Sequence, residues 1–232
     1  MKYSEFESII SPERLRKYIV ACGGNTTKAM TLYRYNLRLS QEMFVVVSCF
    51  EVALRNRIDA IMKAHWGDDW LRDLILPGGA LCCDKRCEKT RKIIEDAYNR
   101  LMKKNIYSHS KLLSEMEFGV WKYMFDNVQY RHLGRILLKV FPNKPKSDKA
   151  HRYDNTYVFG ELGYINTLRN RIAHNEPICF GNNPALLDTT YAKNRYNRIL
   201  TLFRWMDIEG ESLLYGLGHI DSVCNRINAL LK

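Results

Sequence analysis

The stretch SQEMFVVVSCFEVALRNRIDAIM, residues 40–62, decides the fold of this chain. Its large apolar residues recur at steps of three and four positions, which is the spacing of one buried face of an α-helix. They are Met43, Val46, Val47, Phe50, Leu54, Ile58, Ile61 and Met62. Ser40, followed by Gln41 and Glu42, is a suitable helix start, and Gly67 is a suitable end. The stretch therefore predicts one long helix packed inside the protein.

The helical pattern extends along the rest of the chain. Ser11 and Pro12 are typical of a helix start, and the first helix should end at Gly23. We predict helices at 12–22, from about 26, and at 87–104, 111–127, 130–141, 157–174 and 186–206, with a last segment broken near 216–218. Two interruptions, at 76–79 and 141–149, could mark domain boundaries, but neither is long enough to establish separate domains. We expect an all-α protein with a single domain over residues 1–232.

Composition and charge narrow the class of protein. Hydrophobic residues make up 46% of the chain, as in folded globular proteins. Lys and Arg number 36 against 25 Asp and Glu, so the formal net charge is +11 and favours RNA, DNA or an anionic membrane surface as partner. The N-terminus has no apolar signal segment, and the strongest apolar run, residues 43–50, is too short to span a bilayer. We expect a cytoplasmic protein that does not insert into a membrane.

The cysteines predict neither a disulfide framework nor a metal site. Seven cysteines are an odd number, and they lack the regular spacing of a secreted disulfide scaffold. The tightest group, Cys82, Cys83 and Cys87, lacks the paired Cys-x-x-Cys units of structural zinc sites. We therefore expect free thiols and no metal.

The pentapeptide Leu-Arg-Asn-Arg-Ile occurs twice, at Leu54–Ile58 and at Leu168–Ile172, and only the second copy is followed by a histidine, His174. The guanidinium of Arg169, the amide of Asn170 and this imidazole lie within little more than one helical turn. A group that titrates near neutral pH beside a fixed positive charge suits chemistry on phosphodiesters. The first copy has no such titrating group. It therefore serves as a comparison for what the pentapeptide does without a histidine.

Arg169 lies inside an apolar stripe of its predicted helix. The stripe consists of Val158, Leu162, Ile165, Leu168 and Ile172. A charged side chain in this position requires an acidic partner, an interface or a ligand pocket. Asn170 and His174 are four residues apart on the adjacent face, so the amide can orient the imidazole. The segment Asn175–Pro177 is expected to end the helix and leave the histidine near solvent.

Other candidate residues support this site or pack the protein. Glu51 and Arg55, one helical turn apart, are expected to form a buried ion pair, and positioning Arg169 is their alternative role. Asn175 and Glu176 flank the histidine and are expected to support it. The remaining histidines are expected at the surface or in packing, and the tryptophans in the core: His65, His109, His132, His151 and His219, and Trp66, Trp70, Trp121 and Trp205.

Four segments resemble, in this order, the Abi-like (abortive infection) protein family. They are LYRYNLRLS (32–40), FEVALRNRI (50–58), EFGVW (117–121) and LRNRIAHNEPI (168–178). Arg169 and His174, with four residues between them, are similar to the Arg-x4-6-His signature of HEPN ribonucleases. The resemblance reaches from about residue 30 to residue 180.

This resemblance implies an all-α, HEPN-like helical bundle with additional helices, often a homodimer in which two copies of the motif form a composite active site. It implies a metal-independent endoribonuclease without cofactors, acting on RNA in an abortive-infection or toxin-type defence system, with an antitoxin or defence protein as partner. His174 would be general base or acid at the ribose 2′-hydroxyl, Arg169 would stabilise phosphate charge, and Asn170 would orient a partner group. Some HEPN proteins carry a modifiable tyrosine where this chain has Glu176, so that regulation is not expected.

Two other functions remain open, and an Arg and a His at a helix end can also be purely structural. A noncatalytic RNA- or nucleotide-binding module would need Arg169 but not His174. A protein-interaction subunit of a larger defence complex would be recognised by a stable partner of a different sequence.

Overall fold

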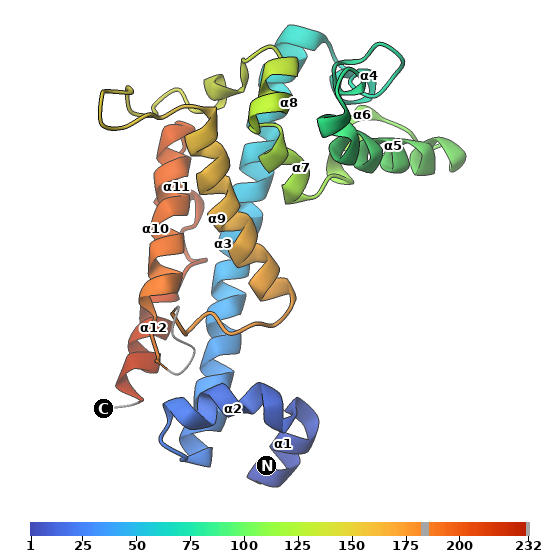
Figure 1. The fold of residues 1–232 in the computed structure, drawn as a ribbon. Coiled ribbons are helices and arrows are strands. Elements are labelled where there is room, and N and C mark those ends of the chain that lie inside the picture. The colour runs from blue at the N-terminus through green and yellow to red at the C-terminus, as the bar shows by residue number, and fades with distance from the viewer. Residues whose placement is uncertain (182–185, 231–232) are drawn as a thin grey trace. The chain divides into compact units, whose positions relative to one another are not determined.

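The computed structural model describes residues 1–181 and 186–230, and the regular elements of this part are helices (Figure 1). The one pairing of extended backbone recorded there is an isolated antiparallel bridge between Phe180 and Leu187. The predicted all-α fold is therefore confirmed. Within the same residues, no helix combines the length and the apolar character needed to cross a membrane.

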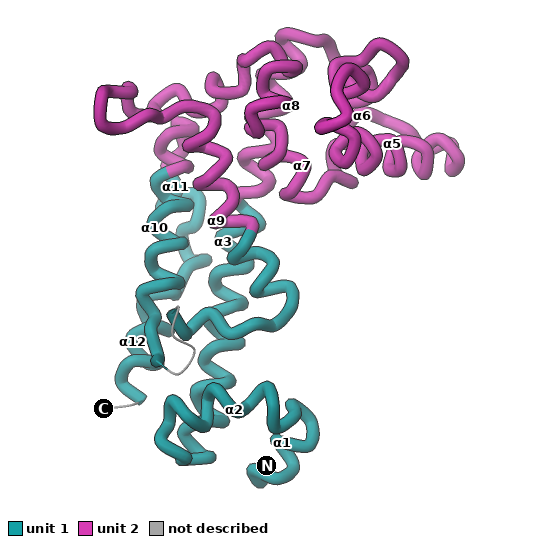
Figure 2. The backbone as a smooth tube through the Cα atoms, in the orientation of Figure 1, with its two compact units in different colours: residues 1–49, 167–201, 210–232 teal, residues 50–166, 202–209 magenta. Residues whose placement is uncertain are grey.

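The chain divides into two compact units (Figure 2). Unit 1 consists of residues 1–49, 167–201 and 210–232, and unit 2 consists of residues 50–166 and 202–209. Three helices contribute residues to both units: α3 (Thr26–Trp66), α9 (Asn155–Ala173) and α10 (Thr190–Trp205).

Helix α3 is continuous from Thr26 to Trp66, so the prediction of separate helices starting near Thr26 and Ser40 is wrong. The buried side chains explain this continuity, because the three- and four-residue spacing passes straight through Ser40. They include Ala29, Leu32, Leu39, Met43, Val46, Val47, Phe50, Leu54, Ile58 and Met62. Ile61 is half-buried. The predicted end is confirmed, since Gly67 has a left-handed φ of 87° directly after the helix.

Unit 1 begins with two short helices, α1 (Tyr3–Ile10) and α2 (Pro12–Ala21). Helix α1 was not predicted, and its buried Phe6 packs edge-to-face on Tyr33 of α3 with ring centroids 5.5 Å apart. Helix α2 starts as predicted, with Ser11 Oγ accepting a hydrogen bond from the backbone N–H of Arg14 at 3.4 Å. Tyr18 of α2 contacts Tyr33 and Phe180, which ties the first two segments of the unit into one aromatic core.

Polar contacts also join distant segments within unit 1, which includes α11 (Gly210–Leu213) and α12 (Ile220–Ala229). The buried Asn36 side chain accepts hydrogen bonds from the backbone N–H groups of Ile178 and Cys179 at 2.8 and 3.2 Å. Glu42 accepts one from the backbone N–H of His219 at 3.1 Å. These bonds fix the segment after α9 and the start of α12 on α3.

Unit 2 contains shorter helices than predicted. They are α4 (Trp70–Asp73), α5 (Glu88–Lys103), α6 (His109–Ser114), α7 (Phe118–Tyr123) and α8 (Asn127–His132), with 3₁₀ turns at Ala80–Cys82, Lys85–Cys87 and Leu137–Val140. Helix α5 confirms the prediction at 87–104. The predicted helix at 111–127 is two helices, because Glu117 has extended backbone. The one at 130–141 ends early, because Gly134 and Arg135 both have left-handed φ values of 76° and 57°.

The side chains expected in the core are mostly there. Trp70 and Trp121 are fully buried and Trp205 is 8% exposed, whereas Trp66 at the end of α3 is 40% exposed, so its placement in the core was wrong. All seven cysteines are free. Cys22, Cys87, Cys179 and Cys224 are buried, Cys49 is half-buried, and Cys82 and Cys83 are exposed. Burial raises the pKa of the Cys179 thiol to about 12.

Candidate functional site

The C-terminal end of α9 presents His174 to solvent. His174 still donates its backbone N–H to the Asn170 carbonyl at 2.9 Å, so Asn170 and His174 do occupy one face. Asn175 then takes a left-handed φ of 52°, and the N–H of Glu176 bonds the Arg171 carbonyl at 2.8 Å. This is a Schellman closure, and asparagine is among the few residues that adopt it at low cost. The predicted helix end and the exposure of the histidine are confirmed.

His174 lines an open pocket of about 330 Å³ that lies within unit 1. Its lining consists of Ser11, Glu13, Arg14, Lys17, His174, Asn175, Glu176 and Pro177. The first four residues come from the cap and first turns of α2, where the helix dipole gives positive potential. Arg14 Nη1 donates to the Asn175 carbonyl oxygen at 3.1 Å, which holds the two chain segments together.

The charges around this pocket are mixed, because Glu13 and Glu176 bring carboxylates and Arg14 and Lys17 bring cations. Glu176 lies 3.7 Å from the Nε of Arg171, so its carboxylate is partly neutralised from outside the pocket lining. Arg14 keeps further N–H donors beyond its bond to Asn175, and Lys17 is exposed. An imidazole near two cations can hold a phosphate group and exchange a proton beside it.

Arg171, the second arginine of the motif, has a structural position. Its Nη2 donates a hydrogen bond to the Pro177 carbonyl oxygen, and its guanidinium lies 4.5 Å from the centre of the Tyr191 ring. These contacts fasten the segment after α9 to α10. Arg171 therefore shapes the pocket without lining it.

Arg169 and Asn170 do not line the pocket that contains His174. Leu168 and Ile172 on either side are buried, as the stripe predicted, and Arg169 is half-buried while Asn170 is exposed. The structure thus brings His174 together with Arg14 and Lys17 rather than with the arginine of its own motif.

The first pentapeptide copy lies on α3 in unit 2, where Leu54 and Ile58 are fully buried. Among the described residues Arg55 forms no ion pair, and its Nε is buried without a hydrogen-bond partner, so the expected pair with Glu51 is not formed. A supporting role of Glu51 or Arg55 towards Arg169 stays a prediction. Of the flanking residues, Asn175 and Glu176 both line the pocket.

A separate polar cluster surrounds Asp59 in unit 2. Asp59 Oδ1 lies 2.7 Å from His109 Nε2 and accepts a hydrogen bond from Trp70 Nε1 at 2.8 Å, and Oδ2 lies 2.8 Å from Lys63 Nζ. Burial raises the pKa of Asp59, but the three partners together lower it below its ordinary value. His109 is half-buried in this cluster, which agrees with its predicted packing role. The cluster joins α3 to α4 and α6.

Arg14 and Lys17 are the site residues that the sequence did not reveal. They lie about 160 positions before His174, and a helix start with basic residues is common. Contacts between residues so far apart in the sequence leave no local sequence pattern that would predict them. The one relevant signal was the capped start at Ser11 and Pro12, which placed both cations in the first turns of a helix.

Comparison with known proteins adds one match. A family model described as "Abi-like protein" matches residues 3–179, more than half of the chain. The match includes α1 to α9 and every residue that lines the His174 pocket. No curated protein and no solved structure matches the chain.

Proposed function

The chain belongs to the Abi-like protein family, and from this membership, which points to abortive-infection defence, we propose that it is a metal-independent endoribonuclease with a HEPN-type active site. One observation carries the proposal: an exposed histidine after α9 lines a pocket with Arg14 and Lys17 at the start of α2. Cations beside a titratable imidazole are what cleavage of RNA without a metal requires.

In the proposed reaction, His174 accepts the proton of a ribose 2′-hydroxyl. The 2′-oxygen attacks the adjacent phosphorus, the bond to the 5′-oxygen breaks, and that oxygen takes up a proton from solvent water as it leaves. The product is a 2′,3′-cyclic phosphate. Arg14 and Lys17 would hold the phosphate, and the DNA backbone would be inert because it lacks the attacking hydroxyl.

The position of Arg169 favours an active site shared by two copies of the chain. Arg169 precedes His174 by five residues, which on an α-helix turns the two side chains about 140° apart. One copy therefore directs them away from each other. In a homodimer, Arg169 of one copy would stabilise the phosphate charge while His174 of the other moves the proton.

The direct test is cleavage of a mixed RNA by the purified chain in the presence of EDTA. His174→Ala should lower the rate by about 10²–10⁴. His65→Ala is the matched control, because His65 is also exposed near the end of a helix, and it should leave the rate unchanged. Cleavage that EDTA abolishes, or that both variants retain, would contradict the proposal.

A mixing experiment tests the shared site. Arg169→Ala and His174→Ala should each be inactive alone, but an equimolar mixture allowed to exchange subunits should recover up to about a quarter of the activity, since half of the dimers then hold one intact site of two. If mass measurement shows that mixed dimers have formed but the activity does not recover, both residues act within one copy.

Because Arg169 does not line the pocket, a second function remains a candidate, that of a noncatalytic RNA-binding module. In that case the His174→Ala variant binds RNA with the same salt sensitivity as the native chain and neither cleaves it. An antitoxin or other defence protein as partner is likewise a prediction, to be tested by purification of the complex from cells.

A further inference from the structure

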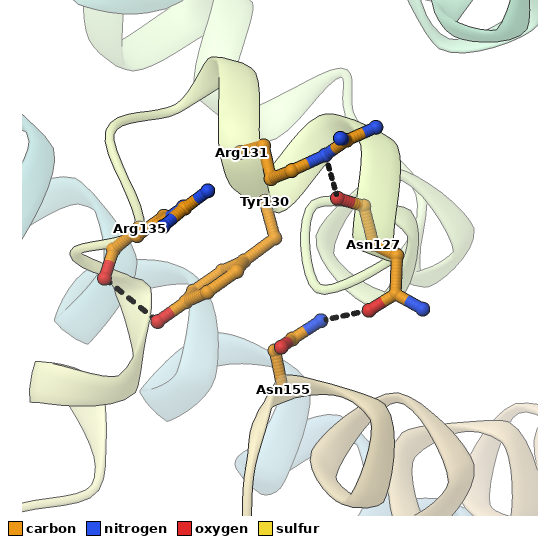
Figure 3. A pocket seen from close by; sticks show the side chains of 5 residues that line it. All are labelled: Asn127, Tyr130, Arg131, Arg135 and Asn155. Carbon is orange, nitrogen blue, oxygen red and sulfur yellow. Dashed lines mark hydrogen bonds between the residues drawn. The ribbon is translucent and has the colours of Figure 1, made fainter.

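A second open pocket, of about 420 Å³, lies in unit 2 between α8 with the turn that follows it and the start of α9 (Figure 3). Its lining consists of Asn127, Tyr130, Arg131, Arg135 and Asn155. All five belong to unit 2, and none belongs to the Arg-x4-His motif. Two arginines and two amides, without a carboxylate, line this opening.

The pocket wall is rigidly built. The N–H of Arg135 bonds the Tyr130 carbonyl at 2.9 Å and that of Gly134 bonds the Arg131 carbonyl at 3.1 Å, which closes α8. The Tyr130 hydroxyl, on a ring that is 8% exposed, donates back to the Arg135 carbonyl oxygen at 2.7 Å. This turn holds the Arg131 and Arg135 side chains at one opening.

The two asparagines leave one amide donor for a ligand. Asn127 Oδ1 accepts hydrogen bonds from Asn155 Nδ2 at 2.8 Å and from Thr156 Oγ1 at 3.0 Å. Its Nδ2 is therefore the group left to donate into the pocket. Asn155 Nδ2 is anchored further by the Phe125 carbonyl at 3.1 Å.

Neither arginine is neutralised by the protein. Within residues 1–181 and 186–230, Arg131 and Arg135 form no ion pair, and Arg131 uses its Nε on the Asn127 carbonyl at 3.2 Å. The carboxylates nearest in sequence do not line the pocket: Asp126 accepts a hydrogen bond from the N–H of Val128, and Asp154 accepts one from the N–H of Tyr157 and lies 3.7 Å from Arg152 Nε. The terminal guanidinium nitrogens are thus available to an anion.

Arg135 occupies a position where a glycine would be less strained. Its φ of 57° lies in the left-handed region, and it follows Gly134, which has the same handedness. An unfavourable backbone at a residue with an unpaired charged side chain is typical of ligand sites.

We propose that this pocket binds the phosphate group of a nucleotide, either free or at the end of an RNA strand. Two guanidinium forks and an amide N–H match the several oxygens of a phosphate, whereas a carboxylate would be satisfied by one arginine. The volume exceeds that of a phosphate and falls among the roughly 300–1,000 Å³ of small-molecule sites, which leaves room for the attached nucleoside. The site is independent of His174.

The test is calorimetric titration with AMP, adenosine and inorganic phosphate. AMP should bind at least ten times more tightly than adenosine, and phosphate should compete with AMP. Arg131→Gln and Arg135→Gln should each weaken AMP binding tenfold or more. Arg57→Gln, at an exposed position of unit 2 outside the pocket, is the charge-matched control and should bind AMP as the native chain does.

Short 2′-O-methyl oligonucleotides, which lack the attacking hydroxyl, distinguish the two sources of the phosphate. Tighter binding of the 5′-phosphorylated form than of the 5′-hydroxyl form, lost in both arginine variants, identifies the end of a strand. Binding of AMP alone identifies a free nucleotide. His174→Ala should bind every probe as the native chain does, so a failure of the ribonuclease proposal does not alter this result.

A second variant protects the test from misfolding. Arg135→Gly removes the side chain and relieves the backbone, so it should lose AMP binding without a lower melting temperature. If AMP binding is absent in the folded native chain, or is unchanged in the Gln and Gly variants, the pocket is not a phosphate site.

Discussion

Arg135 is a residue at which stability and function are expected to oppose each other. Its left-handed φ of 57° costs about 1–2 kcal/mol in an L-residue, and glycine adopts it freely. Glycine also gains about 0.5–1 kcal/mol of conformational freedom in the unfolded chain. Arg135→Gly should therefore leave the free energy of unfolding unchanged or raise it by up to about 1 kcal/mol, as measured by urea denaturation.

The neighbouring glycine gives a control in which the free energy of unfolding should change in the opposite direction. Gly134 has a φ of 76°, and an added Cβ would meet only the Ile136 Cγ2 atom, at an ordinary 3.9 Å. The cost of Gly134→Ala is thus conformational, and it should lower the free energy of unfolding by about 1–2 kcal/mol. If both substitutions destabilise equally, the strain at Arg135 is not real.

At the candidate site, the sequence predicted the exposed His174 and the end of its helix because both depend on local chemistry. The Asn175-Glu176-Pro177 segment closes the helix by its own backbone preferences. Arg14 and Lys17 could not be predicted, since their approach to His174 depends on packing across the whole of unit 1. The role of Arg171 was likewise hidden, because Tyr191 is distant in sequence.

Among the elements, α3, α4 and α6 are joined through one carboxylate, Asp59. Asp59→Asn removes the charge that Lys63 and His109 approach, while the amide oxygen still accepts from Trp70. The free energy of unfolding at pH 7 should fall by about 1.5–3 kcal/mol. Asp96→Asn on α5 is the control, because Asp96 is exposed, and it should change the value by less than about 0.5 kcal/mol.

The effect of Asp59 should depend on pH in a defined direction. Its pKa in the folded chain is lowered from the ordinary 3.8, so its contribution is complete above that value and is lost as the pH falls through the folded pKa. The difference between native chain and Asp59→Asn should therefore shrink as the pH falls below about 4. A difference that grows in acid would contradict the assigned contacts.

Long periodic elements were predictable and short ones were not. The stripes of α3, α5 and α9 continue over many turns, so the three- and four-residue spacing is unambiguous. Helices α6, α7 and α8 have six residues each, and their ends depend on single residues such as Glu117 and Gly134. Ser40 misled the prediction because a capping residue inside a continuous apolar stripe does not start a new helix.

For the whole molecule, the formal charge of +11 predicts strongly salt-dependent binding of single-stranded RNA. If the His174 pocket holds phosphates, replacing Arg14 and Lys17 together by Gln should reduce the slope of log K against log salt by about 1.4, or about 0.7 per contact. Filter binding at about six salt concentrations between about 50 and 300 mM measures the slope.

The control replaces Lys92 and Lys103 of α5, which are exposed and outside both pockets. This pair removes the same charge and should leave the slope nearly unchanged. An equal change in both double variants would mean that RNA responds to the net charge rather than to the pocket.

The distribution of the thiols provides a natural handle for spectroscopy. All seven cysteines lie within the described residues, and the two exposed ones, Cys82 and Cys83, are adjacent. A maleimide dye applied briefly to the native chain should therefore attach first within one short segment of unit 2, ahead of the half-buried Cys49 of unit 1, with no engineered cysteine. The buried thiols are shielded and, as at Cys179, have raised pKa values, so they react only after unfolding. Fluorescence anisotropy of that dye can then report ligand binding in the unaltered sequence.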